Sequence, residues 1–117
     1  MRNDKENFIV NHSFKFSLAI IQFSEELRGL YKYEMASQIF RSGTSIGANI
    51  AEAQNAESKA DFIHKFKIAA KEADELKYWL KLCLACPYYP CPDGILLDDL
   101  KSIILVISKI IATSKNK

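Results

Sequence analysis

The segment Gly43–Gly47 reads Gly-Thr-Ser-Ile-Gly, which matches the pattern of a hydrolase nucleophile elbow. Such an elbow exposes its serine on a sharp turn between a strand and a helix, with a histidine and an acid nearby. Here Ser45 lies within an apolar stripe of helical period, and no strand is predicted before it. We therefore interpret Gly43 and Gly47 as small residues that let the second and third predicted helices approach closely, and we do not predict an esterase.

Three cysteines and two histidines are further residues whose chemistry could serve a site. The spacing of Cys83, Cys86 and Cys91 is C-x2-C-x4-C, which resembles part of a metal site. A structural zinc site takes four ligands, however, and neither His12 nor His64 lies nearby in the sequence. Cys83 also falls on an apolar helical stripe, where a free thiol behaves as a small hydrophobe. We therefore expect no metal and no cofactor. We also expect no enzyme activity, because neither histidine has an obvious nucleophile beside it.

A strip of lysines is predicted on the third helix, on the face opposite its apolar stripe. Lys67, Lys71 and Lys81 share this face with one acid and one tyrosine. One interpretation is a solvated face with charge pairs between neighbouring turns. The alternative is a nucleic-acid-binding strip that follows a phosphate backbone, with Arg41 of the second helix as a fourth candidate contact.

Polar side chains line one flank of the second predicted helix, beside its apolar stripe. Antiparallel pairing with the third helix brings Arg41 opposite Glu72 or Glu75, and it brings Asn49 opposite positions 64 or 65. We interpret this flank as a boundary network that fixes the helix register, and the alternative is a binding site for a ligand or partner. The predicted network consists of Ser45, Asn49, Glu52 and Glu75.

Four amphipathic helices, each marked by apolar residues at three- and four-residue spacing, are predicted to position these side chains. Because the links between the first three helices are short, neighbouring helices are expected to run antiparallel. The sequence therefore predicts an all-α, up-down-up-down four-helix bundle, with residues 1–117 as one domain. The predicted core stripes, in chain order, are Phe16, Ile20, Phe23, Leu27 and Leu30, with Phe14, Leu18 and Ile21 beside them; Ile39, Gly43, Ile46, Ile50 and Ala53; Phe62, Phe66, Ala69, Ala73, Leu76, Leu80 and Cys83; and Leu100, Ile104, Ile107 and Ile111.

The predicted helix boundaries follow from capping chemistry. Gly29 is placed near the end of the first helix, and Ser58 with Asp61 resembles a capping box that opens the third. All three prolines lie in the segment 86–92, which must end the third helix. Asp93 is then positioned to cap the fourth helix.

The composition is that of an ordinary globular domain, with 49% hydrophobic and 26% charged residues. Sixteen Lys and Arg against fourteen Asp and Glu give a net charge of +2, which permits contact with nucleic acid without requiring it. The charged first residues do not resemble a secretory signal, and the charges within the apolar segment 95–112 argue against a membrane span. The odd number of cysteines indicates reduced thiols, so we expect a cytoplasmic protein.

The fourth predicted helix is apolar on more than one side. Its segment Ser102–Ile107 carries Leu105 and Val106 about 100° or more away from the predicted core stripe. Scattered exposed aliphatic residues are normal on protein surfaces. A contiguous patch is more typical of an intermolecular contact, so we interpret Leu105 and Val106 as part of an oligomer interface.

The segment Arg41–Ala53, with sequence RSGTSIGANIAEA, resembles the signature of the bacterial four-helix-bundle family associated with intervening sequences of 23S ribosomal RNA genes. The segments Phe66–Ala69 and Glu75–Leu80 are similar to the third helix of that family. The resemblance implies a cytoplasmic bundle that assembles into a ring-like homopentamer and has no enzymatic activity. Relatives include the accessory protein of diversity-generating retroelements, which binds a reverse transcriptase and nucleic acid through a basic surface. This chain departs from that relative because it is only mildly basic and acids interrupt its lysine strip.

These observations lead to a hypothesis of a non-catalytic oligomeric scaffold that binds RNA, DNA or a nucleic-acid enzyme such as a reverse transcriptase. Its motivation is the family resemblance together with the lysine strip. The alternative is a pure protein–protein interaction module with no nucleic-acid role, in which the outer surface of the fourth helix docks a different partner.

Overall fold

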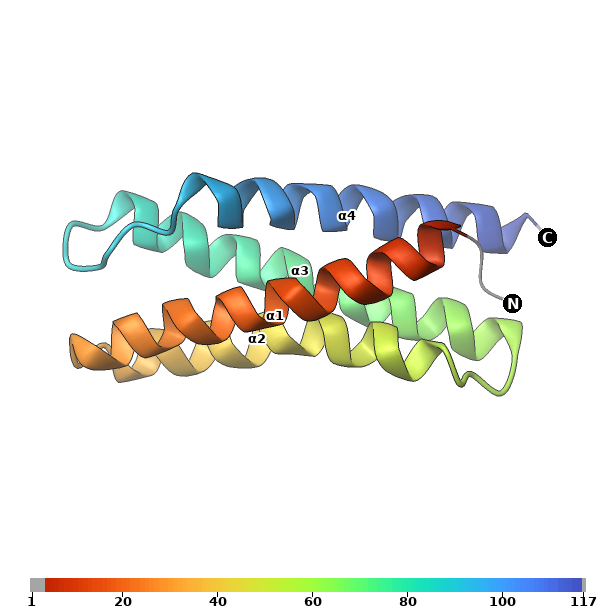
Figure 1. Ribbon diagram of the computed structural model, residues 1–117, viewed down its shortest axis with the longest axis horizontal. Helices are drawn as coiled ribbons and strands as arrows, with labels where there is room; N and C mark the ends of the chain where they lie inside the picture. Colours follow the sequence, from red (N-terminus) through yellow and green to blue (C-terminus); the bar gives the residue numbers. More distant parts are fainter. Residues whose placement is uncertain (1–3, 117) are drawn as a thin grey trace.

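Four long helices make up the computed structural model, which describes residues 4–116 (Figure 1). They are α1 (Asp4–Gly29), α2 (Tyr33–Ala53), α3 (Lys59–Ala85) and α4 (Gly94–Lys115). No strand occurs within the described residues, so the predicted all-α fold is confirmed. Each helix forms because a long segment without proline carries apolar residues at helical spacing, which gives it one face to bury.

Side-chain caps open α3 and α4. The Ser58 hydroxyl accepts a hydrogen bond from the Asp61 backbone N–H at 3.0 Å, and the Asp61 carboxylate accepts one from the Glu57 N–H at 3.2 Å. The Asp93 carboxylate accepts a hydrogen bond from the Leu96 N–H at 2.7 Å. Both predicted N-terminal caps are therefore confirmed, and each satisfies a backbone donor that the first helical turn leaves free.

The other helix boundaries also lie where the sequence places breakers. Helix α1 ends at Gly29, and Tyr31 in the following turn adopts the left-handed conformation with φ of 64°. The Lys32 N–H donates to the Leu27 carbonyl at 2.9 Å, which closes the end of the helix. Helix α3 ends at Ala85, directly before the proline-rich segment 86–93.

Successive helices run in opposite directions and form a four-membered bundle (Figure 1). On α2 and α3, Arg41 pairs with Glu72 whereas Glu52 pairs with Lys65, so residue numbers rise along one helix as they fall along the other. Each helix packs against two neighbours, because α1 contacts α2 and α4, and α3 contacts the same two helices. The molecule measures 47 × 21 × 19 Å, as expected for an up-down-up-down bundle of long helices.

The core of the bundle contains most of the residues in the predicted stripes. The whole stripe of α2 is buried, as is that of α3 apart from the half-buried Phe62. Leu30 is an exception, because it lies in the turn after α1 and is 50% exposed. The three residues placed beside the first stripe are also exposed on the outer surface of α1, namely Phe14, Leu18 and Ile21.

The buried face of α4 differs in phase from the predicted one. Ile104 and Ile111 are only half-buried, whereas Leu100 and Ile107 are in the core as predicted. The prediction was wrong in phase because this helix is apolar on several sides, so apolar spacing alone does not select one face. Packing against α1 and α3 selects the face formed by Leu96, Leu100, Ile103, Ile107 and Ile110.

The two glycines of α2 lie against α1, and the prediction that they pack against the third helix was wrong. A β-carbon added at Gly43 would lie 2.6 Å from Cγ2 of Ile20, and one added at Gly47 would lie 2.9 Å from Oγ of Ser17. Both neighbours belong to α1. A residue on a bundle helix can face either of two flanking helices, and the sequence stripe does not distinguish them.

Packing is uneven around the bundle. Helix α2 packs extensively against both of its neighbours, whereas α4 packs less extensively against α1 and α3. Close packing of α2 follows from its two glycines on the α1 side and its ion pairs with α3. The looser contact of α4 leaves a groove between α3 and α4.

Candidate partner-binding surfaces

Arg41 connects α2 to two carboxylates of α3. Its Nη1 donates to Oε2 of Glu72 at 3.0 Å, and its Nη2 donates to Oε1 of Glu75. Nη2 also donates to Oε1 of Gln38 at 3.4 Å, and the Trp79 indole N–H donates to the same Glu75 oxygen at 3.3 Å. The predicted position of Arg41 opposite these two acids is confirmed, and it sets the register of α2 on α3.

This cluster is a weak site for a phosphate. One guanidinium faces two carboxylates, so the ionised group of Arg41, Glu72 and Glu75 carries a net charge of −1. A phosphate that approached Arg41 would meet both acids. Arg41 therefore joins α2 to α3, and its predicted contact with nucleic acid stays a prediction.

The rest of the predicted network forms separate local contacts. The Asn49 side chain donates to the Ser45 carbonyl of its own helix at 2.8 Å, and does not bond across to α3. Lys65 donates to Glu52 at 2.9 Å, and this hydrogen bond raises the pKa of the Lys65 ammonium. Glu75 belongs to the Arg41 cluster. The flank of α2 thus carries two ion-paired contacts with α3, separated by Asn49.

Lysines without an ion pair to any described residue are concentrated on α3 and α4. Lys67, Lys71 and Lys81 are exposed on α3, as predicted for the outer face of that helix. Asp74 and Tyr78 are exposed on the same face. Two further exposed lysines, Lys77 on the neighbouring flank of α3 and Lys101 on α4, line the same groove as Lys81 and were not predicted from the sequence.

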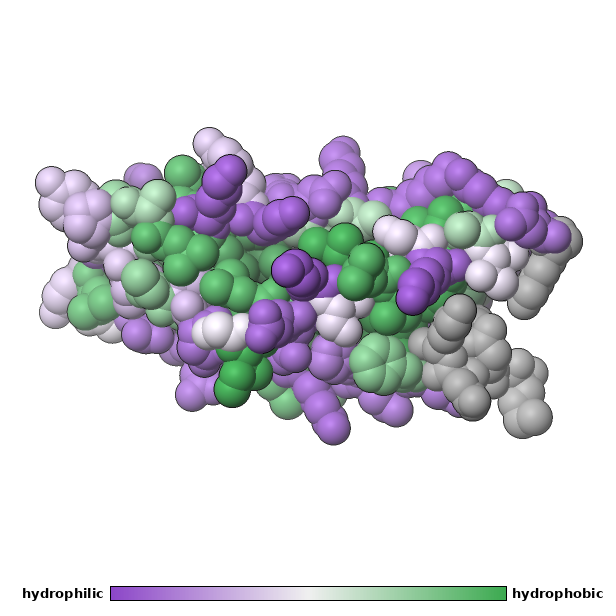
Figure 2. All heavy atoms as spheres, turned by 90° about the horizontal axis from the view of Figure 1, so that it is seen from above, coloured by the Kyte–Doolittle hydropathy of each residue, from purple (hydrophilic) through white to green (hydrophobic). Residues whose placement is uncertain are grey.

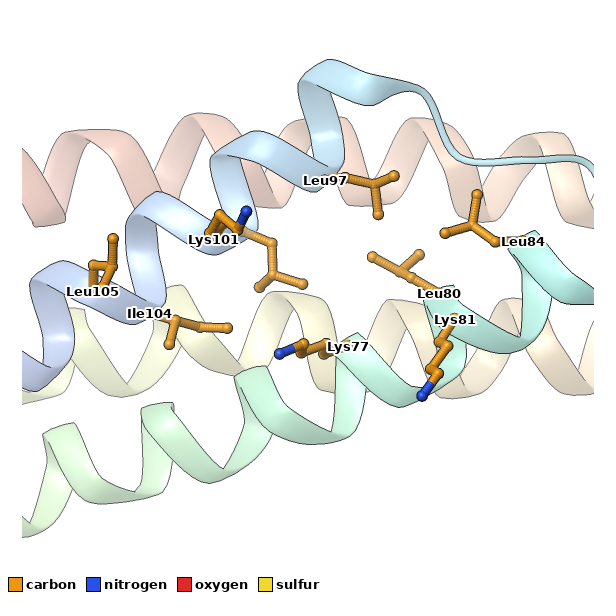
Figure 3. A pocket seen from close by; sticks show the side chains of 9 residues that line it. Lys77, Leu80, Lys81, Leu84, Leu97, Lys101, Ile104 and Leu105 are labelled. Carbon is orange, nitrogen blue, oxygen red and sulfur yellow. The ribbon is translucent and has the colours of Figure 1, made fainter.

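A groove of about 430 Å³ lies between α3 and α4. Figure 3 shows Leu80 and Leu84 of α3 and Leu97 of α4 pointing toward one another across it. Ile104 and Leu105 line the part farther along α4. The polar side chains that line this groove are all lysines, namely Lys77, Lys81 and Lys101. We call this feature the α3/α4 groove.

A second and more exposed apolar surface covers α1 and α2. Phe14 is 66% exposed, Leu18 is 54% exposed, and Ile21 and Phe40 are also exposed. They surround a shallow hollow of about 760 Å³ in which Lys15 is the only charged lining residue among those described. Phe14, Leu18 and Ile21 have helical spacing, so the sequence contained the signal for a second stripe but not for its exposure. We call this feature the α1/α2 surface.

The two residues predicted at an oligomer interface have different surroundings. Leu105 is 57% exposed and lines the α3/α4 groove, whereas Val106 is half-buried and packs against the core. Seen from the α4 side, apolar atoms form a band along the molecule between hydrophilic side chains (Figure 2). Leu105 therefore belongs to an exposed apolar region, and its role in assembly stays a prediction.

The residues with catalytic or metal-binding chemistry are dispersed. Ser45 lies in the middle of α2, so the strand-to-helix turn of a nucleophile elbow is missing around it. Cys83 is buried, Cys86 is half-buried and Cys91 is exposed, and burial raises the pKa of the Cys83 thiol to about 11. Across residues 4–116, no three His, Cys, Asp or Glu side chains come together in a group that could hold a metal ion. None of the described helices is long and apolar enough to cross a membrane.

The fold is a four-helix bundle with exposed apolar regions on its surface. The chain belongs to the family of the 23S rRNA-intervening sequence protein, whose family model matches residues 5–112. It is similar to the crystal structure of a protein of unknown function from the S23 ribosomal protein family of Bacteroides thetaiotaomicron. The two share 39% sequence identity with a TM-score of 0.85, over 92% of this chain and 98% of that one. No curated protein gives a significant match.

Proposed function

We propose that this protein is a non-catalytic, homo-oligomeric scaffold whose α3–α4 side binds nucleic acid or an enzyme that acts on nucleic acid. The observation that carries the proposal is the distribution of charge. Exposed lysines without an ion pair to a described residue gather on α3 and α4, whereas Lys15 is the only charged residue among those described that line the hollow of the α1/α2 surface. The family's association with 23S rRNA intervening sequences supports a role near nucleic acid. The dispersion of Ser45, the histidines and the cysteines supports a role without catalysis.

The dimensions of the lysine strip support contact with a phosphate backbone. Lys67 and Lys81 are fourteen residues apart on one straight helix, which corresponds to about 21 Å. That length corresponds to about six base pairs along a duplex axis, so Lys67, Lys71 and Lys81 can each contact a separate phosphate. Asp74 lies between them and lowers the local positive potential, which favours moderate, non-specific affinity.

Salt-dependent binding of a labelled duplex RNA or DNA tests the nucleic-acid role. Three phosphate contacts predict that affinity falls about 40-fold between 50 and 200 mM salt. The double variant Lys67→Gln/Lys71→Gln should weaken binding and reduce the salt slope by about 2, because each lysine releases about one counterion. Lys15→Gln, on the α1/α2 surface, is the matched control. Absence of salt-dependent binding to either nucleic acid would remove this part of the proposal.

We further propose that the copies assemble through the α1/α2 surface, whose exposed phenylalanines and aliphatic residues are unfavourable in water. Family resemblance implies a pentamer, so light scattering should give about five times the 13.3 kDa mass of one chain. Leu18→Lys should lower that mass while leaving the helical circular dichroism unchanged. If Leu105→Lys lowers the mass and Leu18→Lys does not, the interface lies on α4, as the sequence originally predicted.

The second candidate function is a protein–protein interaction module with no nucleic-acid role. The α3/α4 groove favours it, because a floor of leucine side chains offers nothing to a phosphate backbone. A wild-type protein that forms the oligomer but fails the nucleic-acid titration would support this alternative.

A further inference from the structure

The α3/α4 groove combines an apolar floor with a positive border. Leu80, Leu84 and Leu97 face one another in it, and Leu84 is exposed to solvent although it is a large hydrophobic residue. Its volume of about 430 Å³ is within the range of sites that take specific ligands. Apolar side chains that remain exposed in such a hollow gain free energy when a ligand removes them from water.

The charges at the groove have one sign. Lys77 and Lys81 line it from α3 and Lys101 lines it from α4, although the Lys81 ammonium points away from the leucines (Figure 3). Among the described residues that line the groove none is acidic, and none of the three lysines forms an ion pair with a described residue. A complementary ligand therefore carries carboxylates beside its apolar part. The hollow of the α1/α2 surface lacks this border, since Lys15 is its only charged lining residue among those described.

The length of the groove matches two turns of a helix. Lys77 to Leu84 spans about 10 Å along α3, and Leu97 to Leu105 spans about 12 Å along α4. Two turns of a bound helix present apolar anchors at positions i, i+3 or i+4, and i+7. The groove is partly open to solvent, so a bound alkyl chain would stay partly in water, whereas an amphipathic helix covers the groove and keeps its polar face outside.

We infer that the α3/α4 groove binds an acidic amphipathic helix of a partner protein. Leucine-like anchors fill the floor formed by Leu80, Leu84 and Leu97, and flanking Asp or Glu side chains pair with Lys77 and Lys101. The inference rests on the proposed scaffold function and gives the chemical class of its protein partner. Nucleic acid is disfavoured at this groove, because its sugars and phosphates would not bury the aliphatic floor.

A designed helical peptide provides the test. The probe is a fluorescein-labelled, end-capped peptide with leucine at i, i+3 and i+7, glutamate on both flanks and alanine elsewhere. It should bind the full-length protein at least tenfold more tightly than a peptide with lysine in place of every glutamate, or one with alanine in place of every leucine. Fluorescence anisotropy at a fixed, physiological salt concentration gives the three affinities.

Protein variants locate the site. Leu84→Asn should reduce affinity for the acidic peptide at least tenfold, whereas Leu18→Asn on the α1/α2 surface should leave it within twofold. Both residues are exposed, so circular dichroism should show that each variant remains folded. Lys77→Glu/Lys101→Glu should reverse the preference, so that the lysine-flanked peptide now binds more tightly than the glutamate-flanked one.

Three results would overturn the inference: no binding of the acidic peptide, equal affinity for the acidic and basic peptides, or unchanged affinity in Leu84→Asn. If Lys77→Glu/Lys101→Glu lowers nucleic-acid affinity tenfold and the acidic peptide does not bind, the groove lysines serve nucleic acid. Failure of the nucleic-acid titration together with peptide binding would instead reject the nucleic-acid role and keep the groove assignment.

Discussion

The close contact between Gly43 and Ile20 predicts the effect of adding a single methyl group. In Gly43→Ala, the new β-carbon would lie 2.6 Å from Cγ2 and 2.8 Å from Cγ1 of Ile20. Ile20 is fully buried, and both of these atoms branch directly from its β-carbon. The clash therefore cannot be relieved by moving the flexible end of a side chain, so α1 and α2 must separate or Ile20 must change rotamer.

The net destabilisation follows from two opposing contributions. Replacing glycine by alanine within a helix stabilises it by about 1 kcal/mol. Overpacking a core contact costs about 1–3 kcal/mol, and two separations below 3.0 Å place Gly43 toward the upper part of that range. We therefore expect Gly43→Ala to lower the free energy of unfolding by about 1–2 kcal/mol and Tm by about 3–10 °C.

Gly29→Ala is the matched control, because nothing lies within 4 Å of a β-carbon added there and Gly29 does not have positive φ. It should leave stability unchanged or raise it by up to about 1 kcal/mol. Urea denaturation followed by circular dichroism, at equal protein concentration, gives the comparison. In an Ile20→Ala background, Gly43→Ala should leave the free energy of unfolding unchanged or raise it. The effect of Gly43→Ala should thus differ between the two backgrounds by about 2 kcal/mol. A Gly43→Ala protein as stable as wild type would refute the close-approach reasoning.

Three further predictions concern a cap, an ion-pair cluster and a thiol. Asp93→Ala removes the cap of α4 and should lower stability by about 1 kcal/mol in urea denaturation, whereas Asp93→Asn should retain most of it. Arg41→Ala leaves Glu72 and Glu75 without their shared cation, so it should lower the free energy of unfolding. The loss should be only about 1–2 kcal/mol, because the site is half-exposed. Arg41→Lys should recover only part of the lost stability in the same assay. At pH 8, Cys83 should react with a thiol reagent only after unfolding. Folding raises the pKa of the Cys83 thiol from 9.0 to about 11, so the thiol is protonated in both the folded and the unfolded protein well below pH 9. The free energy of unfolding should therefore fall as the pH rises from 9 to 11. An equal fall in Cys83→Ala over the same pH range would contradict this prediction.

The sequence was sufficient to predict the four helices and most of their core. The α3 stripe from Phe66 to Cys83 has strong 3–4 periodicity, and polar residues cover its other side, so only one phase was consistent with burial. The caps at Ser58 and Asp93 were also predictable, because each depends only on residues within the first turn of its helix. The buried face of α4 could not be predicted, because this helix is apolar on several sides and its neighbours decide which side is buried.

The candidate surfaces were harder to predict because exposure depends on which helices become neighbours. Phe14 and Leu18 have the spacing of a core stripe, yet no helix of the same chain covers them. The basic strip on α3 was predicted, but its continuation by Lys101 requires α4 to lie beside α3. The ion pairs of Arg41 with two acids followed from antiparallel pairing, while the hydrogen bond of Asn49 within its own helix did not.

The looser packing of α4 has a consequence for how the molecule opens. Helices α1, α2 and α3 are joined by close glycine contacts and ion pairs, so they should behave as one cooperative unit in native-state hydrogen exchange. Helix α4 is attached through the segment 86–93, through its five buried side chains and through a 3.8 Å contact between Asp99 and His12 of α1. We expect its amides to exchange through a lower-energy opening than those of α2, because fewer close contacts must break. The least protected helix is then the one that forms a wall of the α3/α4 groove, and partner binding there should slow its exchange.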